Sequence, residues 1–318
     1  KQHKSIDKNL LFLILAFVIL GLIAVADASA PQALNSFNDK FYLLKQQTIS
    51  AAIGVVLLFI VSRINYKFWE KVATPFFFIS LALLIIVLIP GIGSRFLGAR
   101  RWISVGELNF QPSELIKLSM AMYFAKVAAS KKGAAAFFFP LTAVVALIMM
   151  QPDLGTSLVV VGIGAAQIFI SGVNILYLMG GGLIGSLLTI ILIMLSPYRR
   201  DRLLTFFEMT EDPLGKSYHI RQVLLALGSG GLFGVGLGAS SQKYLFLPEA
   251  STDSIFSIIV EELGFIGGLT LIFMFLYFIF RALKTVKNAP DDFSRVLSLG
   301  IVVWLGGQAF LNMAAMSA

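Results

Sequence analysis

The sequence contains no cysteine and only two histidines, His3 and His219. Without thiols the chain has no disulfide bonds, no thiolate nucleophile and no cysteine-ligated metal site. Two histidines are also too few for a metal centre built on imidazole ligands. Charged residues make up only 13% of the chain, about half of their usual share in soluble domains. These absences point away from thiol and zinc chemistry and away from a soluble fold.

Long uncharged apolar runs take the place of the missing charge. Hydrophobic residues make up 58% of the sequence, and the mean hydropathy is +0.87. Several runs approach the ~20 residues that cross a bilayer as a helix. We therefore expect an all-α fold, a polytopic transmembrane helical bundle that forms a single domain over residues 1–318. The expected spans are 9–27, 46–63, 72–90, 113–128, 134–151, 155–172, 175–196, 254–281 and 296–317.

Lysine and arginine lie between the apolar runs rather than on one soluble face. The formal net charge of +8 therefore indicates membrane orientation and not nucleic-acid binding. The positive-inside rule places the N-terminus, with Lys1, Lys4 and Lys8, in the cytoplasm. Segment 197–253 is then a large extracytoplasmic loop, expected to lie partly ordered over the outer surface and to have room for an interfacial helix.

Segment 98–103 places Arg100 and Arg101 beside Trp102, on the side where short loops carry few cations. The planar guanidinium group suits phosphate oxygens, and an enzyme that uses a diphosphate-linked lipid needs cations near the headgroup plane. Anchoring to anionic lipid headgroups explains the same residues equally well. Both interpretations stay open for this loop taken alone.

Segment 111–117 brings charge into a span. Pro112 suits the first turn of a helix, and Glu114 and Lys117 then share one helical face. Ionisable groups inside a membrane are costly and usually face a partner or a wet cavity, which favours a functional role. Mutual pairing of the two side chains at a helix end near the interface is the alternative.

Three further motifs carry weaker signals. In the turn 151–156, Asp153 either caps the following helix or meets a substrate group, and capping is favoured. The glycines of 228–238 follow no strand and complete no phosphate-binding motif, so we expect no nucleotide cofactor. Glu261 and Glu262 are consecutive in one span and point to different faces, so at least one should face the bundle interior.

Segment 247–253 sets two carboxylates, Glu249 and Asp253, just before a long span. Asp253 is a candidate general base. Partial burial raises the basicity of such a carboxylate and nearby cations lower it, so the sequence alone determines neither its pKa nor its role. As the N-cap of the following helix, Asp253 would also be ordinary.

These segments, in this order and spacing, closely resemble the SEDS family of cell-wall proteins, whose members serve shape, elongation, division and sporulation. The resemblance covers nearly the whole chain. Segments 240–243 and 247–250 are more similar to the division member than to the elongation member. The motifs that carry the resemblance are Gly-Ala-Arg-Arg-Trp-Ile at 98–103, Gln-Pro-Ser-Glu-Leu at 111–115, Gln-Pro-Asp-Leu-Gly-Thr at 151–156, the glycines of 228–238, Leu-Pro-Glu-Ala at 247–250 and Thr-Asp at 252–253.

The resemblance implies about nine spans of a ten-span fold and a peptidoglycan glycosyltransferase of septal cell-wall synthesis. Such an enzyme polymerises lipid II through β-1,4 linkages and releases an undecaprenyl diphosphate carrier. The implied partners are the lipid II substrate, a class B penicillin-binding protein, other division proteins and membrane lipid. The implied location is the bacterial inner membrane, with the active site facing outward.

The resemblance also assigns roles to particular residues. Asp253, which matches the family's essential aspartate, would deprotonate the acceptor hydroxyl or hold a divalent cation, Mg²⁺ or Mn²⁺. Arg101, with Arg100, would neutralise the diphosphate leaving group. Lys117 would assist from within the cavity, and Glu114 would orient Lys117 or contribute to the site.

Segment 247–253 departs from the family pattern at one position. Glu249 is a weaker substrate-binding candidate beside Asp253, and Ser251 stands where many members have histidine, so a histidine-assisted mechanism is not expected. The family's tenth span, with its Pro-Leu-Pro-Phe segment, is expected to lie beyond the part of the family pattern that residues 1–318 match.

Two other classes of function remain as alternatives. A lipid II flippase would also use buried charges and a cationic outer mouth, but related halves, which many transporters show, are not detected in the sequence. A scaffold that recruits division proteins would leave the charged positions purely structural.

Overall fold

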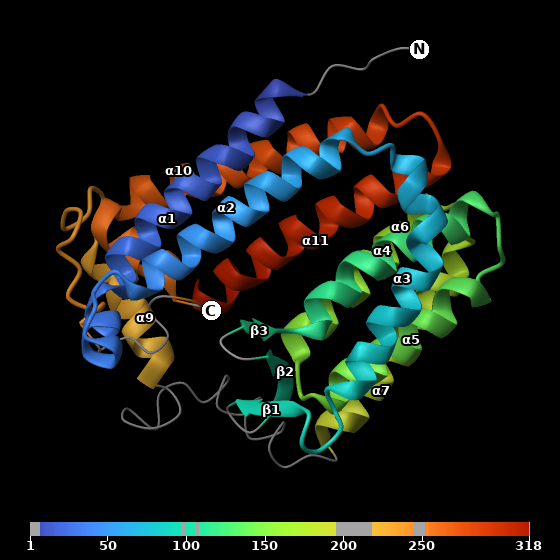
Figure 1. Cartoon of the computed structure of the whole chain (residues 1–318), viewed down its shortest axis with the longest axis horizontal. Helices are drawn as coiled ribbons and strands as arrows, with labels where there is room; N and C mark the ends of the chain where they lie inside the picture. Colours follow the sequence, from blue (N-terminus) through green and yellow to red (C-terminus); the bar gives the residue numbers. More distant parts are fainter. Residues whose placement is uncertain are drawn as a thin grey trace. The chain divides into compact units, whose positions relative to one another are not determined.

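The computed structural model describes residues 7–96, 99–105, 108–194, 218–244, 252 and 254–317 (Figure 1). The chain divides into two compact units, and each is described by itself. Unit 1 comprises Lys1–Arg63, Ile190–Arg281 and Phe310–Ala318, and unit 2 comprises Ile64–Thr189 and Ala282–Ala309. The helices are α1 (Lys8–Phe37), α2 (Tyr42–Arg63), α3 (Tyr66–Ile86), α4 (Pro112–Ala129), α5 (Ala135–Met150), α6 (Leu154–Ile170), α7 (Ile175–Met194), α9 (Tyr218–Ser229), α10 (Ile255–Lys287) and α11 (Asp292–Ser317).

Each of the nine spans expected from the sequence contains a helix, which confirms the helical fold class. The largest difference is α1, which continues through Pro31 to Phe37, beyond the expected end at residue 27. Its first turn is capped by the Asp7 carboxylate, which accepts hydrogen bonds from the N–H groups of Asn9 and Leu10. The additional helix α9 lies within the expected extracytoplasmic loop 197–253.

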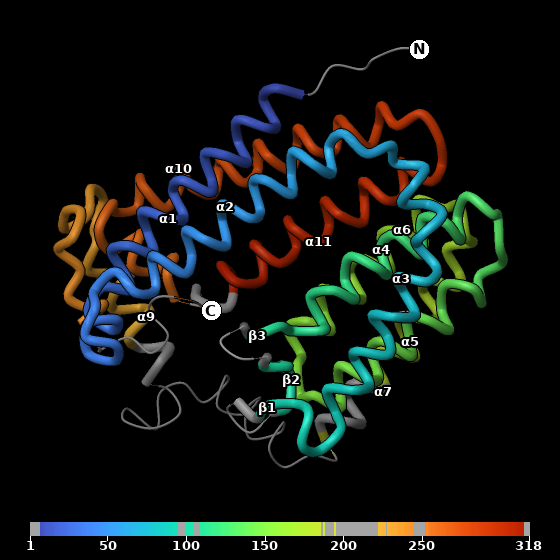
Figure 2. The backbone as a smooth tube through the Cα atoms, in the orientation of Figure 1, coloured from blue at the N-terminus to red at the C-terminus, as the bar shows by residue number. Residues whose placement is uncertain are grey.

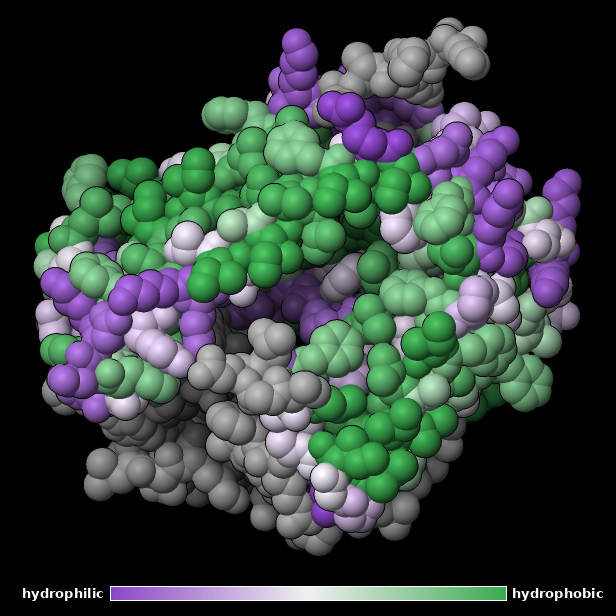
Figure 3. Space-filling view, in the orientation of Figure 1, coloured by the Kyte–Doolittle hydropathy of each residue, from purple (hydrophilic) through white to green (hydrophobic). Residues whose placement is uncertain are grey.

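Within the described residues, five helices, α1, α2, α3, α10 and α11, are long and apolar enough to cross a membrane. The apolar helices α5, α6 and the first part of α7 are shorter, and α4 carries charge within its length. Much of the apolar surface is exposed. Helix α2, for example, has no buried residue. Figure 3 shows apolar side chains along the helices and hydrophilic ones gathered near helix ends. Lipid is the solvent that suits this surface, because water-soluble proteins rarely expose such large apolar patches.

Unit 2 is built around α4, which packs against α3, α5 and α6. Stacked rings of Phe77 and Tyr123 join α3 to α4, and edge-to-face rings of Phe124 and Phe137 join α4 to α5. The buried Gln167 amide of α6 donates hydrogen bonds to the backbone carbonyls of Ala121 and Val296, so one polar side chain links three helices. Figure 2 allows the path of these helices to be followed.

A small antiparallel sheet precedes α4 in unit 2, and the sequence expectation did not include it. Its strands are β1 (Gly93–Phe96), β2 (Ala99–Val105) and β3 (Leu108–Phe110), in the order β1-β2-β3. Trp102, Ile103 and Val105 are residue types that favour a strand. Strand β2 also packs against α4, so the sheet and the start of α4 form one end of the unit.

In unit 1, α1 packs against α2, and the rings of Phe17 and Phe275 stack between α1 and α10. Helix α10 is interrupted at Gly264, which has φ 71° and ψ −175°. The loop after α9 binds this interruption through its backbone. Val235 and Gly236 donate hydrogen bonds to the carbonyls of Glu261 and Glu262, at 3.0 and 3.1 Å. On the other side of the break, Phe265 and Ile266 donate to the carbonyls of Gly231 and Leu232 (2.9 and 3.2 Å).

Candidate functional site

Arg101, on β2, holds the turn that connects α5 to α6. Its Nε donates to the Gln151 carbonyl at 3.0 Å, and its terminal Nη2 donates to the Pro152 carbonyl at 2.6 Å. The Asp153 carboxylate lies 3.9 Å from the Arg101 Nε. The Arg101 side chain is still 31% exposed. The guanidinium group therefore positions this turn and also presents a charge at the surface of the same end of unit 2.

Asp153 caps α6, as the sequence favoured. Its carboxylate accepts hydrogen bonds from the N–H of Thr156 at 3.0 Å and from the Thr156 hydroxyl at 2.9 Å. Arg100 is half-buried, and its guanidinium lies 3.5 Å from the Leu88 carbonyl, at the limit of a hydrogen bond. Arg101 and Asp153 therefore lie together at the turn between α5 and α6, whereas Arg100 contacts the segment that follows α3.

The second set of predicted residues lies on α4. Pro112 is the first residue of the helix, and Lys117 is 1% exposed. The Lys117 ammonium donates to the Glu114 carboxylate at 2.7 Å, so the expected contact on one helical face is present. It also donates to the Gln308 side-chain oxygen at 2.8 Å and lies 5.3 Å from the centre of the Trp304 ring.

Gln308 and Trp304 are contacts that the sequence did not reveal. They lie one turn apart on α11, and the Trp304 indole N–H donates to the same Gln308 oxygen at 2.8 Å. We call Glu114, Lys117, Trp304 and Gln308 the Lys117 site. The residues of α4 and those of α11 are far apart in the sequence. The sequence signal for this site was a polar glutamine four residues after a tryptophan in an apolar span.

A second buried charge site lies in unit 1, and of its members the sequence analysis singled out Glu261 and Glu262. The Lys243 ammonium donates to Asp27 on α1 at 2.7 Å and to Glu262 on α10 at 2.9 Å. The Ser240 hydroxyl donates to the Glu261 carboxylate at 2.5 Å, and the N–H groups of Ser240 and Ser241 donate to Glu262 and Glu261. We call Asp27, Ser240, Lys243, Glu261 and Glu262 the Lys243 site.

The Lys243 site neutralises acidic side chains at the break in α10. Glu261 and Glu262 are 3% and 4% exposed, so both face the interior, where the sequence required at least one. Burial is the largest influence on Lys243 and opposes its charge, but hydrogen bonds to Asp27 and Glu262 outweigh it and raise the pKa of Lys243. The lysine therefore stays protonated at neutral pH. A charged aspartate at position 27, inside an apolar run, was the sequence signal for this site.

The remaining predicted residues, Asp253 and Glu249, lie outside the described part of the chain, as does Ser251. Within the residues that the structure describes, no group of three or more His, Cys, Asp or Glu side chains is arranged to hold a metal ion. The expected roles of Asp253 and of a divalent cation stay predictions.

These features define a multi-pass helical membrane protein with charged side chains buried among its helices. The model of the FtsW/RodA/SpoVE family, described as cell cycle proteins, matches residues 7–318. The chain belongs to this family.

Relatives and solved structures agree with this membership. The chain is 37% identical to a probable peptidoglycan glycosyltransferase FtsW of Trichlorobacter lovleyi, over 98% of this chain and 84% of the relative. It is 39% identical to stage V sporulation protein E of Bacillus subtilis, over 99% and 88%. Among solved structures, one described as the structural coordination of polymerization and crosslinking by a peptidoglycan synthase complex contains a chain with TM-score 0.81 and 28% identity, covering 99% of this chain and 88% of that one. The rod shape determining protein RodA of Thermus thermophilus gives a TM-score of 0.72 at 25% identity, over 100% and 87%.

Proposed function

We propose that this protein is a peptidoglycan glycosyltransferase that polymerises lipid II during septal cell-wall synthesis. The observation that carries the proposal is the match over nearly the whole chain to relatives named probable peptidoglycan glycosyltransferase FtsW. The reaction joins the acceptor hydroxyl to the anomeric carbon of the donor sugar and releases the lipid diphosphate. It requires a base for the hydroxyl proton and cations for the departing diphosphate.

Cationic groups of unit 2 support the second requirement. Arg100 and Arg101 lie on β2, which packs against the helix that carries Lys117. Arg101 is held in place by two backbone carbonyls yet remains partly exposed, so its charge is preorganised for an anion. Lys117 is fixed by Glu114 and Gln308, which supports a role in shaping the electrostatic field of the site.

The base in this proposal is Asp253, with Glu249 as a secondary substrate contact. Both assignments rest on the family resemblance of segment 247–253. A divalent cation, Mg²⁺ or Mn²⁺, held with the help of Asp253 belongs to the same proposal. The partner would be a class B penicillin-binding protein in the bacterial inner membrane, in keeping with the synthase complex whose chain resembles this one.

One structural observation favours the transporter alternative, namely the break in α10 at Gly264. Discontinuous helices form the substrate and ion sites of many transporters. Here, however, the loop 231–236 already bonds to backbone groups on both sides of the break, and Lys243 pairs with Glu262 on the side before it. The polymerase is therefore the better-supported function, and lipid II flipping is the outcome to be excluded.

Polymerisation of purified lipid II by the protein and its penicillin-binding partner tests the proposal. We expect Asp253→Ala to lower the rate at least about 100-fold, because a general base contributes 10² or more. Asp39→Ala is the matched control. The Asp39 carboxylate lies in the loop between α1 and α2 and pairs with Lys45, and its loss is expected to leave polymerisation unchanged. Undiminished polymer from Asp253→Ala would remove Asp253 from catalysis.

Two further arms separate the alternatives. Chelation with EDTA followed by Mg²⁺ or Mn²⁺ addition is expected to abolish and restore polymerisation if a divalent cation takes part. Lipid II flipping in liposomes by a folded, polymerisation-deficient Asp253→Ala protein, at the wild-type rate, would favour the flippase.

A further inference from the structure

A pocket of about 380 Å³ opens in unit 2 at the end opposite the sheet. It lies where the α4–α5 loop, the α6–α7 loop and the first turn of α11 meet. Its volume falls within the roughly 300–1,000 Å³ typical of small-molecule sites. The buried ring of Phe137, together with Val173 and Val296, gives it apolar walls. We call this cavity the basic pocket.

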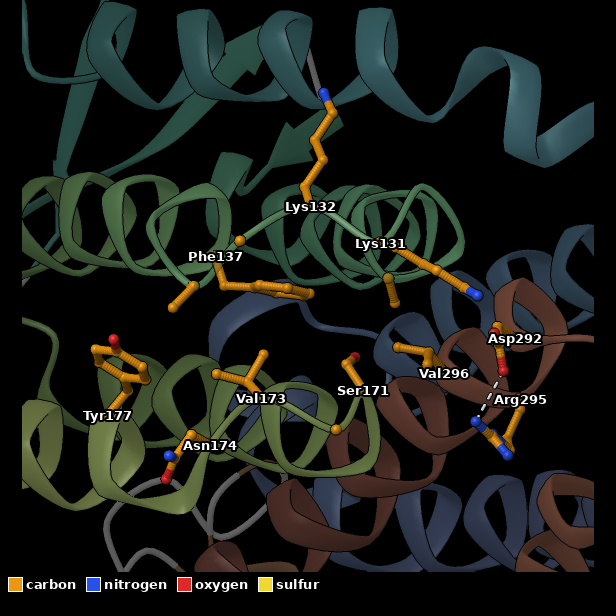
Figure 4. Close-up of a pocket in the computed structure, with 14 residues that line it drawn as sticks. Lys131, Lys132, Phe137, Ser171, Val173, Asn174, Tyr177, Asp292, Arg295 and Val296 are labelled. Carbon is orange, nitrogen blue, oxygen red and sulfur yellow. Dashed lines mark hydrogen bonds and ion pairs between the residues drawn. The ribbon is translucent and has the colours of Figure 1, made fainter.

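The charges that line the basic pocket are mostly positive. Three cationic residues, Lys131, Lys132 and Arg295, line it together with a single carboxylate, Asp292, which pairs with Arg295 at 2.8 Å. Among the residues that the structure describes, neither lysine ammonium has an ion-pair partner. In Figure 4, Lys131 extends toward the Asp292–Arg295 pair, whereas Lys132 points away from Phe137. Because Arg295 is paired with Asp292 and Lys132 points away, Lys131 is the cation beside this pair that has no ion-pair partner among the residues that the structure describes.

Neutral polar side chains and an apolar neighbour complete the surroundings of the pocket. Asn174 and Tyr177 also line the pocket, and Tyr177 is 61% exposed. Ser171 lines it too, but its hydroxyl already donates to the Gln167 carbonyl. Helix α5 starts beside the pocket without a side-chain cap, and the N–H groups of Ala136 and Phe137 in its first turn donate to the backbone carbonyls of Gly133 and Ala134, each at 3.0 Å. The exposed apolar side chain of Leu176 adjoins the pocket on the first turn of α7. An occupant with an anionic head and an apolar body suits both the cationic lining of the pocket and this apolar side chain.

Lys131 occupies a backbone position that glycine would fill more easily. Its φ of 50° lies in the left-handed region. Its N–H bonds to the Ala128 carbonyl at 2.9 Å, and the Lys132 N–H bonds to the Val127 carbonyl at 3.3 Å, which is the pattern that closes a helix with glycine at this position. Replacing Lys131 by glycine therefore removes a charge while relieving backbone strain.

We propose that the basic pocket binds the phosphate group of an anionic phospholipid from the leaflet at that end of the helices. Lys131 and Arg295 contact the phosphate, and the acyl chains lie against the exposed apolar side of α7. This site is separate from the residues assigned to glycosyl transfer and does not rest on that function. Free phosphate carries the same anionic group as the phospholipid headgroup, so the test distinguishes a lipid-bound phosphate from a free one.

Native mass spectrometry of the purified full chain, titrated with phosphatidylglycerol or phosphatidylcholine, measures the proposed binding. We expect phosphatidylglycerol to be retained in preference to phosphatidylcholine. Lys131→Gly and Arg295→Gln should each lower the association constant about fivefold, and Asp292→Asn should raise it, since each charge near a membrane surface changes binding by that order. Lys71→Gln, an exposed lysine of α3 outside the pocket, is the matched control and should leave retention unchanged.

The melting temperature of each variant accompanies the binding measurement. Lys131→Gly is expected to be at least as stable as the wild type, so its loss of lipid is not a consequence of unfolding. Equal retention of phosphatidylglycerol by the wild type and Lys131→Gly would overturn the proposal. Complete displacement of the lipid by millimolar inorganic phosphate would overturn the lipid assignment in favour of free phosphate. Tighter binding of a glutamate-rich peptide than of lipid would overturn it in favour of a protein partner.

Discussion

Glu114 and Lys117 form an ion pair whose two members differ sharply in exposure. The Glu114 side chain is 44% exposed, whereas the Lys117 side chain is 1% exposed. Removing one partner of an ion pair is most costly when the charge left behind is buried. The two members of this pair are therefore not equivalent in their contribution to stability.

We predict that Glu114→Ala destabilises the protein more than Lys117→Met. Loss of the glutamate leaves a buried ammonium with Gln308 as its remaining hydrogen-bond acceptor, at a cost of about 3–5 kcal/mol. Loss of the lysine leaves a carboxylate that water can still reach, at a cost of about 1–2 kcal/mol. Denaturation midpoints in detergent would measure both. Equal midpoints would show that Glu114 is not needed to stabilise the lysine.

At the scale of elements, the break in α10 depends on backbone shape. Gly264 combines a positive φ with an extended ψ, a conformation open essentially to glycine alone. A Cβ atom there would collide with backbone atoms of Gly234 and Leu232, which cannot move aside as a flexible side chain can. The close approach of the loop to the helix therefore requires glycine at this position.

We predict that Gly264→Ala destabilises unit 1 by about 3 kcal/mol or more, through strain and the lost loop contacts. Gly54→Ala, in α2, is the matched control, because no atom of another segment lies within 4 Å of its added Cβ. It should be neutral or stabilising by up to about 1 kcal/mol. Thermal unfolding of the two variants distinguishes them, and a Gly264→Ala protein as stable as the control would contradict the proposed constraint.

At the scale of the whole molecule, orientation in the membrane can be tested directly because the chain has no cysteine. The segment between α3 and α4 is expected outside, and the loop between α4 and α5, with Lys131 and Lys132, is expected inside. Single cysteines introduced at the exposed positions Pro90 and Gly133 report on these two sides.

We predict that a membrane-impermeant maleimide labels Pro90→Cys in spheroplasts and labels Gly133→Cys only after the membrane is opened. The cysteine-free parent protein supplies the background. The reverse labelling pattern would invert the topology and place the basic pocket at the outer leaflet.

The helices were the most predictable part of this molecule, because apolar runs of bilayer length indicate transmembrane helices. The pairing of Glu114 with Lys117 could also be predicted, because it follows from their spacing on one helix. The contacts of Lys117 with Gln308 and of Lys243 with Asp27 were not, because the partners are separated by 191 and 216 residues. The sheet escaped prediction because its strands are short and lie between stronger apolar signals.

The loop that binds the α10 break does so through main-chain atoms, which leaves its side chains free for other uses. Leu232, Phe233 and Leu237 are 63%, 79% and 75% exposed. The backbone hydrogen bonds between the loop and α10 therefore place little constraint on the identity of these side chains, provided that the glycines are kept. Position 233 is accordingly a suitable place for a photo-crosslinking amino acid that captures neighbouring lipids or proteins without loosening the helix it borders.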